Sequence, residues 1–239
     1  MEEHKIGQFF GIGIGPGDPE LLTLKALRVI KNSPVIAFPI KAVNETSYAL
    51  SIVRNFIDIK RQQLLPLLFP MTKNKEIIEQ QWKEATEAVF RHLQQGKDVA
   101  FLTEGDPLFY STFIHLYRYM GLLHPEVTVQ SIPGISSIFG AAASLHLPLA
   151  DGDAQVGIIP ATRNKDHMKK AIELHETIIF LKIAKVLDLL VDVLIETNTL
   201  EKAAIVTKAT SNEEIIYKNV LDLKGKELPY LSLMVVKRT

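Results

Sequence analysis

The sequence predicts an α/β fold in which alternating strands and helices build a parallel sheet. Short apolar runs of strand length recur along the chain, and segments with apolar residues at helical spacing separate them. In three places an apolar run ends in a turn rich in glycine and proline, and a helical pattern follows directly. Strand, turn and helix in this rhythm are typical of parallel strands that helices connect.

The elements follow in order from these patterns. The strands expected in the first part of the chain are 6–12, 35–39, 63–69, 98–102 and 127–132. The helices expected between and after them are 21–30, 46–56, 73–95, 111–119 and 134–145. In the long helix 73–95 the residues expected to face the core, by their helical spacing, are Ile77, Ile78, Trp82, Ala85, Val89 and Leu93.

A seam between two domains is expected at 146–153, where proline, glycine and polar turn residues fall together. The domains are therefore expected to be 1–147 and 148–239. The strands expected beyond the seam are 155–159, 177–181, 203–206 and 231–237, with a helix at 183–196. Segment 213–223 is expected to form hairpin-style strands with 231–237.

Composition limits the classes of function. Lys+Arg and Asp+Glu both number 27, so no basic excess indicates a nucleic-acid partner. The absence of cysteine excludes disulfides, thiolate metal sites and a cysteine nucleophile, and the seven histidines show no metal-ligand pairing. The N-terminus lacks the pattern of a secretion signal, and no apolar stretch is long enough to span a bilayer. We therefore expect a cytoplasmic protein with no metal site and no membrane partner.

The first glycine-rich turn is Gly11-Ile12-Gly13-Ile14-Gly15-Pro16-Gly17-Asp18-Pro19-Glu20. Glycines after a first strand let backbone approach a ligand and supply dihedrals that other residues resist, so we expect a small ligand here. A purely structural tight turn is the alternative. The dinucleotide spacing G-x-G-x-x-G is broken, because Asp18 and Pro16 stand where the two possible frames require glycine.

The second motif is Thr103-Glu104-Gly105-Asp106-Pro107-Leu108-Phe109-Tyr110-Ser111-Thr112, and the third is Pro133-Gly134-Ile135-Ser136-Ser137. The three motifs in this order resemble the tetrapyrrole methylase family over nearly the whole chain. The Phe-Tyr-Ser-Thr continuation of the second motif is similar to the branch that methylates carbon 20 of precorrin-2 in cobalamin synthesis. Branches that act earlier, on uroporphyrinogen, tend to continue with Phe-x-Phe-Gly-Arg-Gly, which this sequence lacks.

This resemblance implies two α/β domains with a cofactor cleft between them, a homodimer, and S-adenosyl-L-methionine as methyl donor. It places Gly105 and Asp106 under the amino-acid portion of the donor, and Pro16 near the reacting face. The residues that it assigns to donor binding are Pro16, Gly105, Asp106, Phe109, Ser111, Thr112, Ile135, Ser136, Lys182 and Ala209, with Tyr230 and Leu231 as weaker matches. Lys182 replaces the methionine expected in uroporphyrinogen-type relatives.

A sulfonium methyl group is already electrophilic, so such an enzyme mainly has to hold the methyl group and the acceptor carbon close and in line. A proton must then leave the methylated carbon, and Glu104, Asp106 and Tyr110 are the candidate catalytic residues. The acceptor would be a tetrapyrrole, either precorrin-2 or its cobalt-containing equivalent. The basic stretch 163–170 is the candidate contact for the carboxylates of the ring.

Each assignment has a plainer alternative. Asp106 is also a common turn or capping residue, and Ser136 with Ser137 would also suit a helix N-cap. For Lys182 the alternative is an exposed lysine at the start of a helix. For the basic stretch 163–170 it is a solvated helix face. For the protein as a whole, the alternatives are a methylase acting at another ring position and a non-catalytic nucleotide-binding module.

Overall fold

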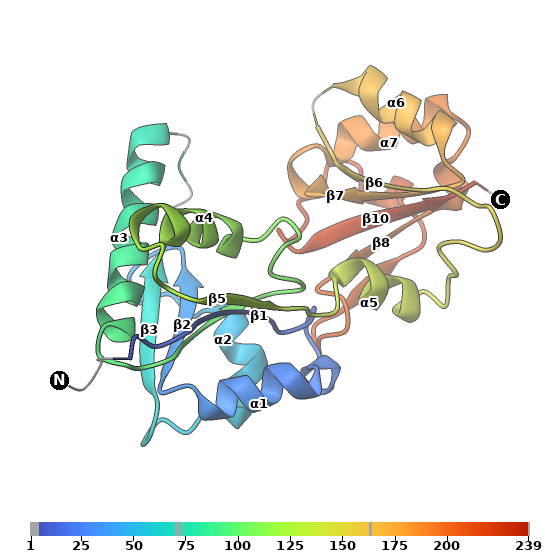
Figure 1. Cartoon of the computed structure of the whole chain (residues 1–239). Helices are drawn as coiled ribbons and strands as arrows, with labels where there is room; N and C mark the ends of the chain where they lie inside the picture. Colours follow the sequence, from blue (N-terminus) through green and yellow to red (C-terminus); the bar gives the residue numbers. More distant parts are fainter. Residues whose placement is uncertain (1–4, 70–71, 73, 163, 239) are drawn as a thin grey trace. The chain divides into compact units, whose positions relative to one another are not determined.

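The computed structural model describes residues 5–69, 72, 74–162 and 164–238. The chain folds as two compact units, Met1–Ser136 and Ser137–Thr239, and each is described on its own (Figure 1). Residue 73, at the start of the expected helix 73–95, and Arg163 of the basic stretch lie outside the described residues.

The first unit is built on a sheet of five parallel strands in the order β3-β2-β4-β1-β5. Its strands are β1 (Phe9–Gly13), β2 (Val35–Ile40), β3 (Gln63–Leu68), β4 (Val99–Thr103) and β5 (Val129–Ile132). Its helices are α1 (Leu24–Asn32), α2 (Tyr48–Val53), α3 (Lys75–Leu93) and α4 (Phe113–Leu123), with short 3-10 helices η1 (Pro19–Leu21) and η2 (Arg54–Phe56). The α/β class and the parallel pairing predicted for this part of the chain are confirmed.

Helices cover both faces of this sheet (Figure 1). With α1 and α2, the core on one face includes Ile12, Ile30, Ile36, Ile52 and Leu102. With α3 and α4, the core on the other face includes Phe9, Val89, Phe101, Leu116 and Met120. Strands buried on both faces are expected to be continuously apolar, which is why they stand out as apolar runs in the sequence.

Polar side chains fix where the helices begin. Thr23 accepts a hydrogen bond from the backbone of Ala26 at the start of α1 (3.1 Å), and Asn74 accepts two at the start of α3. The inward orientation expected for Ile77 is wrong, because this side chain is 46% exposed. The first turns of α3 extend beyond the sheet, so they have no core to face (Figure 1).

The second unit has a mixed sheet in the order β6-β7-β10-β8-β9. Its strands are β6 (Val156–Pro160), β7 (Thr177–Leu181), β8 (Ala203–Thr207), β9 (Ile215–Tyr217) and β10 (Ser232–Lys237). Its helices are α5 (Ser137–Ser144), α6 (Lys165–Leu174) and α7 (Leu187–Glu196), with 3-10 helices η3 (Ile183–Lys185), η4 (Leu200–Lys202) and η5 (Leu221–Leu223). Helices α6 and α7 share a core with one face of the sheet, and α5 packs on the other.

The hairpin expected between 213–223 and 231–237 is wrong. Strand β10 lies between β7 and β8 and is antiparallel to both, while β9 pairs with β8 at the edge. Leu233, Met234, Val235 and Val236 are all buried, so β10 needs cover on both faces and suits a central position. The short β9 is only half buried, which suits an edge.

The chain divides after Ser136 rather than after the expected Leu147. Helix α5 belongs to the second unit because its apolar side chains share a core cluster with that unit's sheet. The cluster contains Ile138, Ala141, Ile179, Val206, Ala209, Leu233 and Val235.

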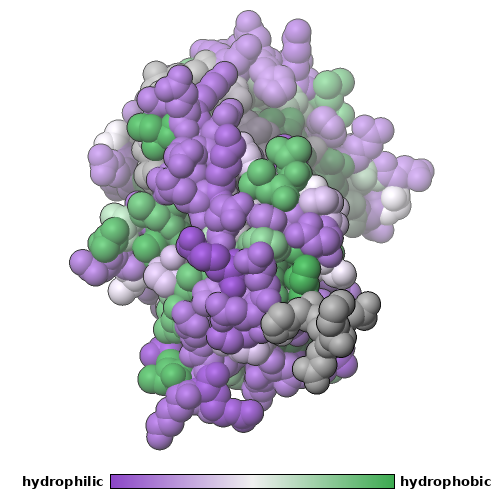
Figure 2. All heavy atoms as spheres, turned by 60° about the vertical axis from the view of Figure 1, so that its left-hand side comes forward, coloured by the Kyte–Doolittle hydropathy of each residue, from purple (hydrophilic) through white to green (hydrophobic). Residues whose placement is uncertain are grey.

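Within the described part of the chain, no helix combines the length and the apolar character that crossing a membrane would require. On the face in Figure 2, hydrophobic side chains form small scattered groups among hydrophilic ones.

Candidate functional site

The three motifs follow the carboxyl ends of three neighbouring strands, β4, β1 and β5. The first two are hydrogen-bonded to each other: the backbone N–H of Gly105 donates to the carbonyl of Gly15 (2.8 Å), and that of Ile14 donates to the carbonyl of Thr103 (3.1 Å). Open α/β sheets bind ligands outside the carboxyl ends of their strands. The structure therefore brings the motifs together at one edge, where a ligand site is expected.

The glycines of the motifs let the protein approach itself. A Cβ atom on Gly13 would lie 2.5 Å from the nitrogen of Gly134 and 2.6 Å from the carbonyl oxygen of Gly105, closer than real Cβ contacts. A Cβ atom on Gly11 would overlap the ring of Phe113. Gly15 has a left-handed backbone (φ 81°), which favours glycine. At Gly11 and Gly13 the close approach that we expected toward a ligand is made to other parts of the first unit.

Asp106 connects the second motif to the third. One carboxylate oxygen accepts a hydrogen bond from the backbone N–H of Leu108 (2.9 Å), and the other accepts one from that of Gly134 (3.1 Å). A carboxylate has about four acceptor positions, so both oxygens keep capacity for a further donor. Asp106 is thus a turn residue, as the plainer alternative holds, and it stays available to a ligand.

Glu104 directly follows β4 and is half buried. Burial raises the pKa of its carboxyl group, because the charged form loses solvation. Backbone N–H groups of Glu104 itself and of Ala49 in α2, together with the charge of Lys41, oppose this rise more weakly. The protonated state of Glu104 is therefore easier to reach than that of an ordinary glutamate.

The rest of the second motif has a buried anchor and an exposed tip. The hydroxyl of the buried Ser111 lies 2.9 Å from that of Thr103 and accepts a hydrogen bond from the N–H of Phe113 (3.1 Å). Phe109 and Tyr110 are exposed, and their rings meet edge to face with centroids 4.8 Å apart. Tyr110 has a left-handed backbone (φ 52°), an unfavourable conformation for a bulky residue that is often found at functional sites.

The remaining expected residues of the first unit lie in the same loops. Pro16 is buried beside Gly15, whereas Thr112, Ile135 and Ser136 are half buried. Ser136 is the last residue before α5. Whether Ser136 and Ser137 cap α5 stays a prediction.

In the second unit, Lys182 and Ala209 follow β7 and β8. These two strands run in the same direction, because each is antiparallel to β10 between them. Lys182 and Ala209 therefore lie at the same end of these strands. Leu231 lies there too, because its carbonyl accepts a hydrogen bond from the backbone N–H of Lys208 (2.8 Å). Lys182 is exposed and has a left-handed backbone conformation (φ 59°), whereas Ala209 is buried.

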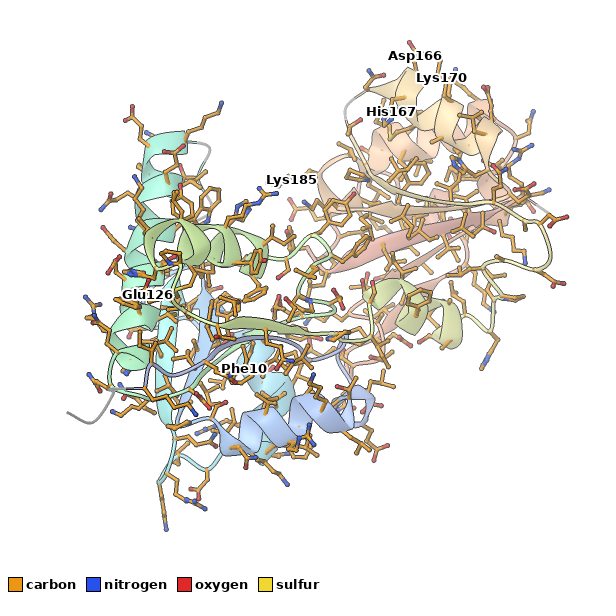
Figure 3. The ribbon with its side chains drawn as sticks, in the orientation of Figure 1. Phe10, Glu126, Asp166, His167, Lys170 and Lys185 are labelled. Carbon is orange, nitrogen blue, oxygen red and sulfur yellow. The ribbon has the colours of Figure 1, made fainter. Side chains whose placement is uncertain are left out.

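The basic stretch 163–170 is partly neutralised within its own unit. Lys165 and Lys169 of α6 both form ion pairs with Glu196 of α7. These two lysines lower the pKa of the Glu196 carboxyl through hydrogen bonds and charge. Asp166 and Lys170 point away from the sheet of the unit (Figure 3). The structure favours a solvated helix face over a contact for ring carboxylates.

The hydrogen-bond partners that hold the loops could not be predicted from the sequence. In the sequence, Thr103 looks like an ordinary strand residue and Gly134 like an ordinary turn glycine. Nothing there indicates the hydrogen bond of Thr103 with Ser111 or that of Gly134 with Asp106. In the described ranges, no three histidine, aspartate or glutamate side chains form a group that could hold a metal ion.

Known proteins resemble this chain over almost its whole length. The family model "Tetrapyrrole (Corrin/Porphyrin) Methylases" matches residues 8–224. The "Probable cobalt-precorrin-2 C(20)-methyltransferase" of Methanocaldococcus jannaschii is 36% identical, over 98% of this chain and 97% of the relative. The precorrin-2 C(20)-methyltransferase of a Sinorhizobium species is 30% identical over 97% and 95%, and the cobalt-precorrin-2 C(20)-methyltransferase of Salmonella typhimurium is 27% identical over 97% of each.

Solved structures share the fold. The cobalt precorrin-4 methyltransferase CbiF superposes with a TM-score of 0.68 at 21% identity, covering 96% of this chain and 94% of its own. The uroporphyrin-III C-methyltransferase of Thermus thermophilus, in complex with S-adenosylhomocysteine, superposes with a TM-score of 0.66 at 20% identity, covering 97% of each chain. The motifs, the fold and these matches agree, and the chain belongs to the tetrapyrrole methylase family.

Proposed function

We propose that the protein transfers a methyl group from S-adenosyl-L-methionine to carbon 20 of precorrin-2 or of cobalt-precorrin-2, in cobalamin biosynthesis. The observation that carries this proposal is the full-length similarity to relatives named for this reaction. Their names include both the metal-free and the cobalt-containing acceptor, so both stay candidates. The cobalt would belong to the substrate.

The residues at the edge of the first sheet fit the donor. S-adenosyl-L-methionine supplies a methyl group made electrophilic by its sulfonium. Asp106 would receive the ammonium of the amino-acid portion, since its two oxygens keep acceptor capacity beyond Leu108 and Gly134. Gly105 would lie under the same amino-acid portion, Pro16 would lie near the reacting face, and Ile135 with Ser136 would lie beside the sugar or base.

The other donor residues have different parts in this proposal. Phe109 and Thr112 would contact the donor, whereas the buried Ser111 would act by fixing the loop that carries them. Lys182 and Ala209 would serve the adenosyl side from the second unit. The cofactor cleft between the units is a proposal too, and it rests on the family resemblance.

For the proton that leaves carbon 20 we propose Glu104 as acceptor. Burial raises the pKa of this carboxyl group, which makes its carboxylate a stronger base than an exposed glutamate. Asp106 already holds two backbone N–H groups, and Tyr110 lies at the exposed tip of the loop. These two stay the alternative catalytic residues.

A homodimer in the cytoplasm, free of nucleic acid and membrane, completes the proposal. The family resemblance supports the dimer, and the even charge balance supports the absence of nucleic acid. Sedimentation of the purified chain would test the dimer, and a monomer at all concentrations would contradict it.

The experiment that tests the function is turnover with a labelled methyl donor. Labelled methyl should appear in precorrin-2 or its cobalt complex, at carbon 20. Label at another ring carbon would indicate a different tetrapyrrole methylase. Binding of S-adenosylhomocysteine without any turnover would favour the non-catalytic nucleotide-binding module.

A further inference from the structure

The loop 208–214 of the second unit carries Ala209, the proposed adenosyl contact, in an unfavourable backbone arrangement. Lys208 and Thr210, on either side of it, both have left-handed backbones, with φ angles of 47° and 65°. Residues with side chains adopt this conformation only where surrounding contacts impose it. The position of Ala209 therefore depends on the hydrogen bonds that hold the backbone of its neighbours, and Leu231 and Ser211 supply those of Lys208.

Glu214 supplies such a restraint. The same carboxylate oxygen accepts a hydrogen bond from the backbone N–H of Thr210 and one from the hydroxyl of Ser144 (2.7 Å). Glu214 is half buried, so these bonds are less exposed to competing water than bonds at the surface. A single carboxylate thus connects the loop of Ala209 to the last residue of α5.

Helix α5 links this connection to the third motif. It begins at Ser137, directly after Ile135 and Ser136, and ends at Ser144. Its Ile138 and Ala141 share a core cluster with Ala209. Hydrophobic contacts are not directional, whereas the bonds of Glu214 fix one orientation of loop and helix.

We propose that Glu214 is a positioning residue of the methyl-donor site, acting through Thr210 on Ala209 and through Ser144 on α5. The inference rests on the proposed function, because Ala209 is a donor contact only there. Glu214 lies outside all three motifs. Its neighbour Glu213 offers a matched control, since it pairs with Lys208 through an exposed side chain.

Calorimetry with S-adenosylhomocysteine on the full chain tests the role. Glu214→Ala should weaken binding about tenfold, the order expected for losing a hydrogen bond to a charged group. Glu214→Gln should bind within about twofold of the unaltered chain, because its amide oxygen can accept both bonds. Glu213→Ala should also stay within about twofold, since exposed ion pairs contribute little.

In steady-state kinetics Glu214→Ala should raise the Michaelis constant of the donor and leave that of the acceptor unchanged. Ser144→Ala should weaken binding less than Glu214→Ala, and adding it to Glu214→Ala should cost nothing further, because both remove the same connection. Unchanged binding in Glu214→Ala, an equal loss in Glu213→Ala, or no rescue by Glu214→Gln would overturn the inference. If Glu214→Ala fails to fold, Ser144→Ala decides: it should weaken binding more than Glu213→Ala does, and equal binding in the two would overturn the inference.

Hydrogen exchange of the Thr210 amide separates this inference from the proposed function. In the ligand-free chain, Glu214→Ala should expose this amide to faster exchange, and Glu213→Ala should not. If the unaltered chain binds no S-adenosylhomocysteine, the donor assignment fails and the positioning role with it. If it binds, and Thr210 exchanges equally in all variants, the inference alone is overturned.

Discussion

Single side chains hold the candidate site by bonding to backbone. Asp106 accepts N–H groups from two motifs, and Ser111 accepts one from the start of α4. A short acidic or hydroxyl residue can replace a missing backbone partner in a turn, and its loss leaves a donor unsatisfied. Substitutions at these residues should therefore alter loop structure and ligand binding together.

Asp106→Ala should lower the free energy of unfolding by about 1.5–3 kcal/mol, the range for hydrogen bonds to charged groups, and weaken S-adenosylhomocysteine binding. Asp106→Asn should recover part of both, because its single amide oxygen can accept from Leu108 or Gly134 while its NH₂ group cannot. Urea unfolding and calorimetry measure the two effects. Full stability and full affinity in Asp106→Ala would remove this residue from both roles.

Glu104 should make stability depend on pH. Its pKa is higher in the folded state than the ordinary value of 4.5, so its carboxyl group favours folding when protonated and opposes folding when ionised. Relative to the unaltered chain, Glu104→Gln should gain stability as the pH rises from below 4.5 through the raised pKa. Urea unfolding across this range measures the difference. A difference that does not change with pH would contradict the burial assigned to Glu104.

Loss of activity in Glu104→Gln with normal donor binding would agree with the role of proton acceptor. A turnover rate close to that of the unaltered chain would pass this role to Asp106 or Tyr110. Both outcomes are read at neutral pH.

At the scale of elements, the motif loops fit together as closely as a protein core. Because Gly13 has no Cβ atom, the backbone of Gly105 in the second motif and of Gly134 in the third can lie against it. Strand ends and glycine turns were predictable from the sequence, because apolar runs and turn residues are local signals. The contact of Gly13 with Gly105 and Gly134 was not, since it depends on the order β4-β1-β5 in the sheet.

Gly13→Ala should therefore be strongly destabilising, by about 3 kcal/mol, because backbone rather than a flexible side chain occupies the space of the new methyl group. Gly121→Ala in α4 is the matched control. Nothing lies within 4 Å of its Cβ position, so helix propensity should make it stabilising by up to about 1 kcal/mol. Thermal unfolding of both variants measures the contrast, and similar melting temperatures would show that the motifs do not meet at Gly13.

The ion pairs between α6 and α7 lead to a prediction about the acceptor. Lys165 and Lys169 are committed to Glu196, so Lys165→Gln with Lys169→Gln should leave the Michaelis constant of the acceptor within about twofold. Kinetics at two ionic strengths check this. If the Michaelis constant rises in the double variant, and rises more at low salt, the basic stretch contacts the ring carboxylates after all. Exposed charges act over about 10 Å at 0.1 M salt, so such a contact would weaken as salt is added.

At the scale of the whole molecule, each unit has its own sheet and hydrophobic core. The alternation of strand and helix patterns predicted the α/β class, and the turn residues at 146–153 together with the family resemblance predicted two domains. The place of division and the central position of β10 escaped sequence reasoning. Helix α5 has apolar residues that suit either unit. The apolar run 233–236 indicates a strand buried on both faces, but it does not say which strands lie beside it.

The reaction proposed for this protein is the transfer of one methyl group from S-adenosyl-L-methionine to carbon 20 of precorrin-2 or its cobalt complex. Anaerobic incubation with each acceptor and a carbon-13 methyl donor, followed by mass spectrometry and NMR of the product, tests it most directly. We expect one labelled methyl group per ring, attached at carbon 20, from at least one of the two acceptors. Label at any other carbon, or none in either acceptor while the donor is bound, would contradict it.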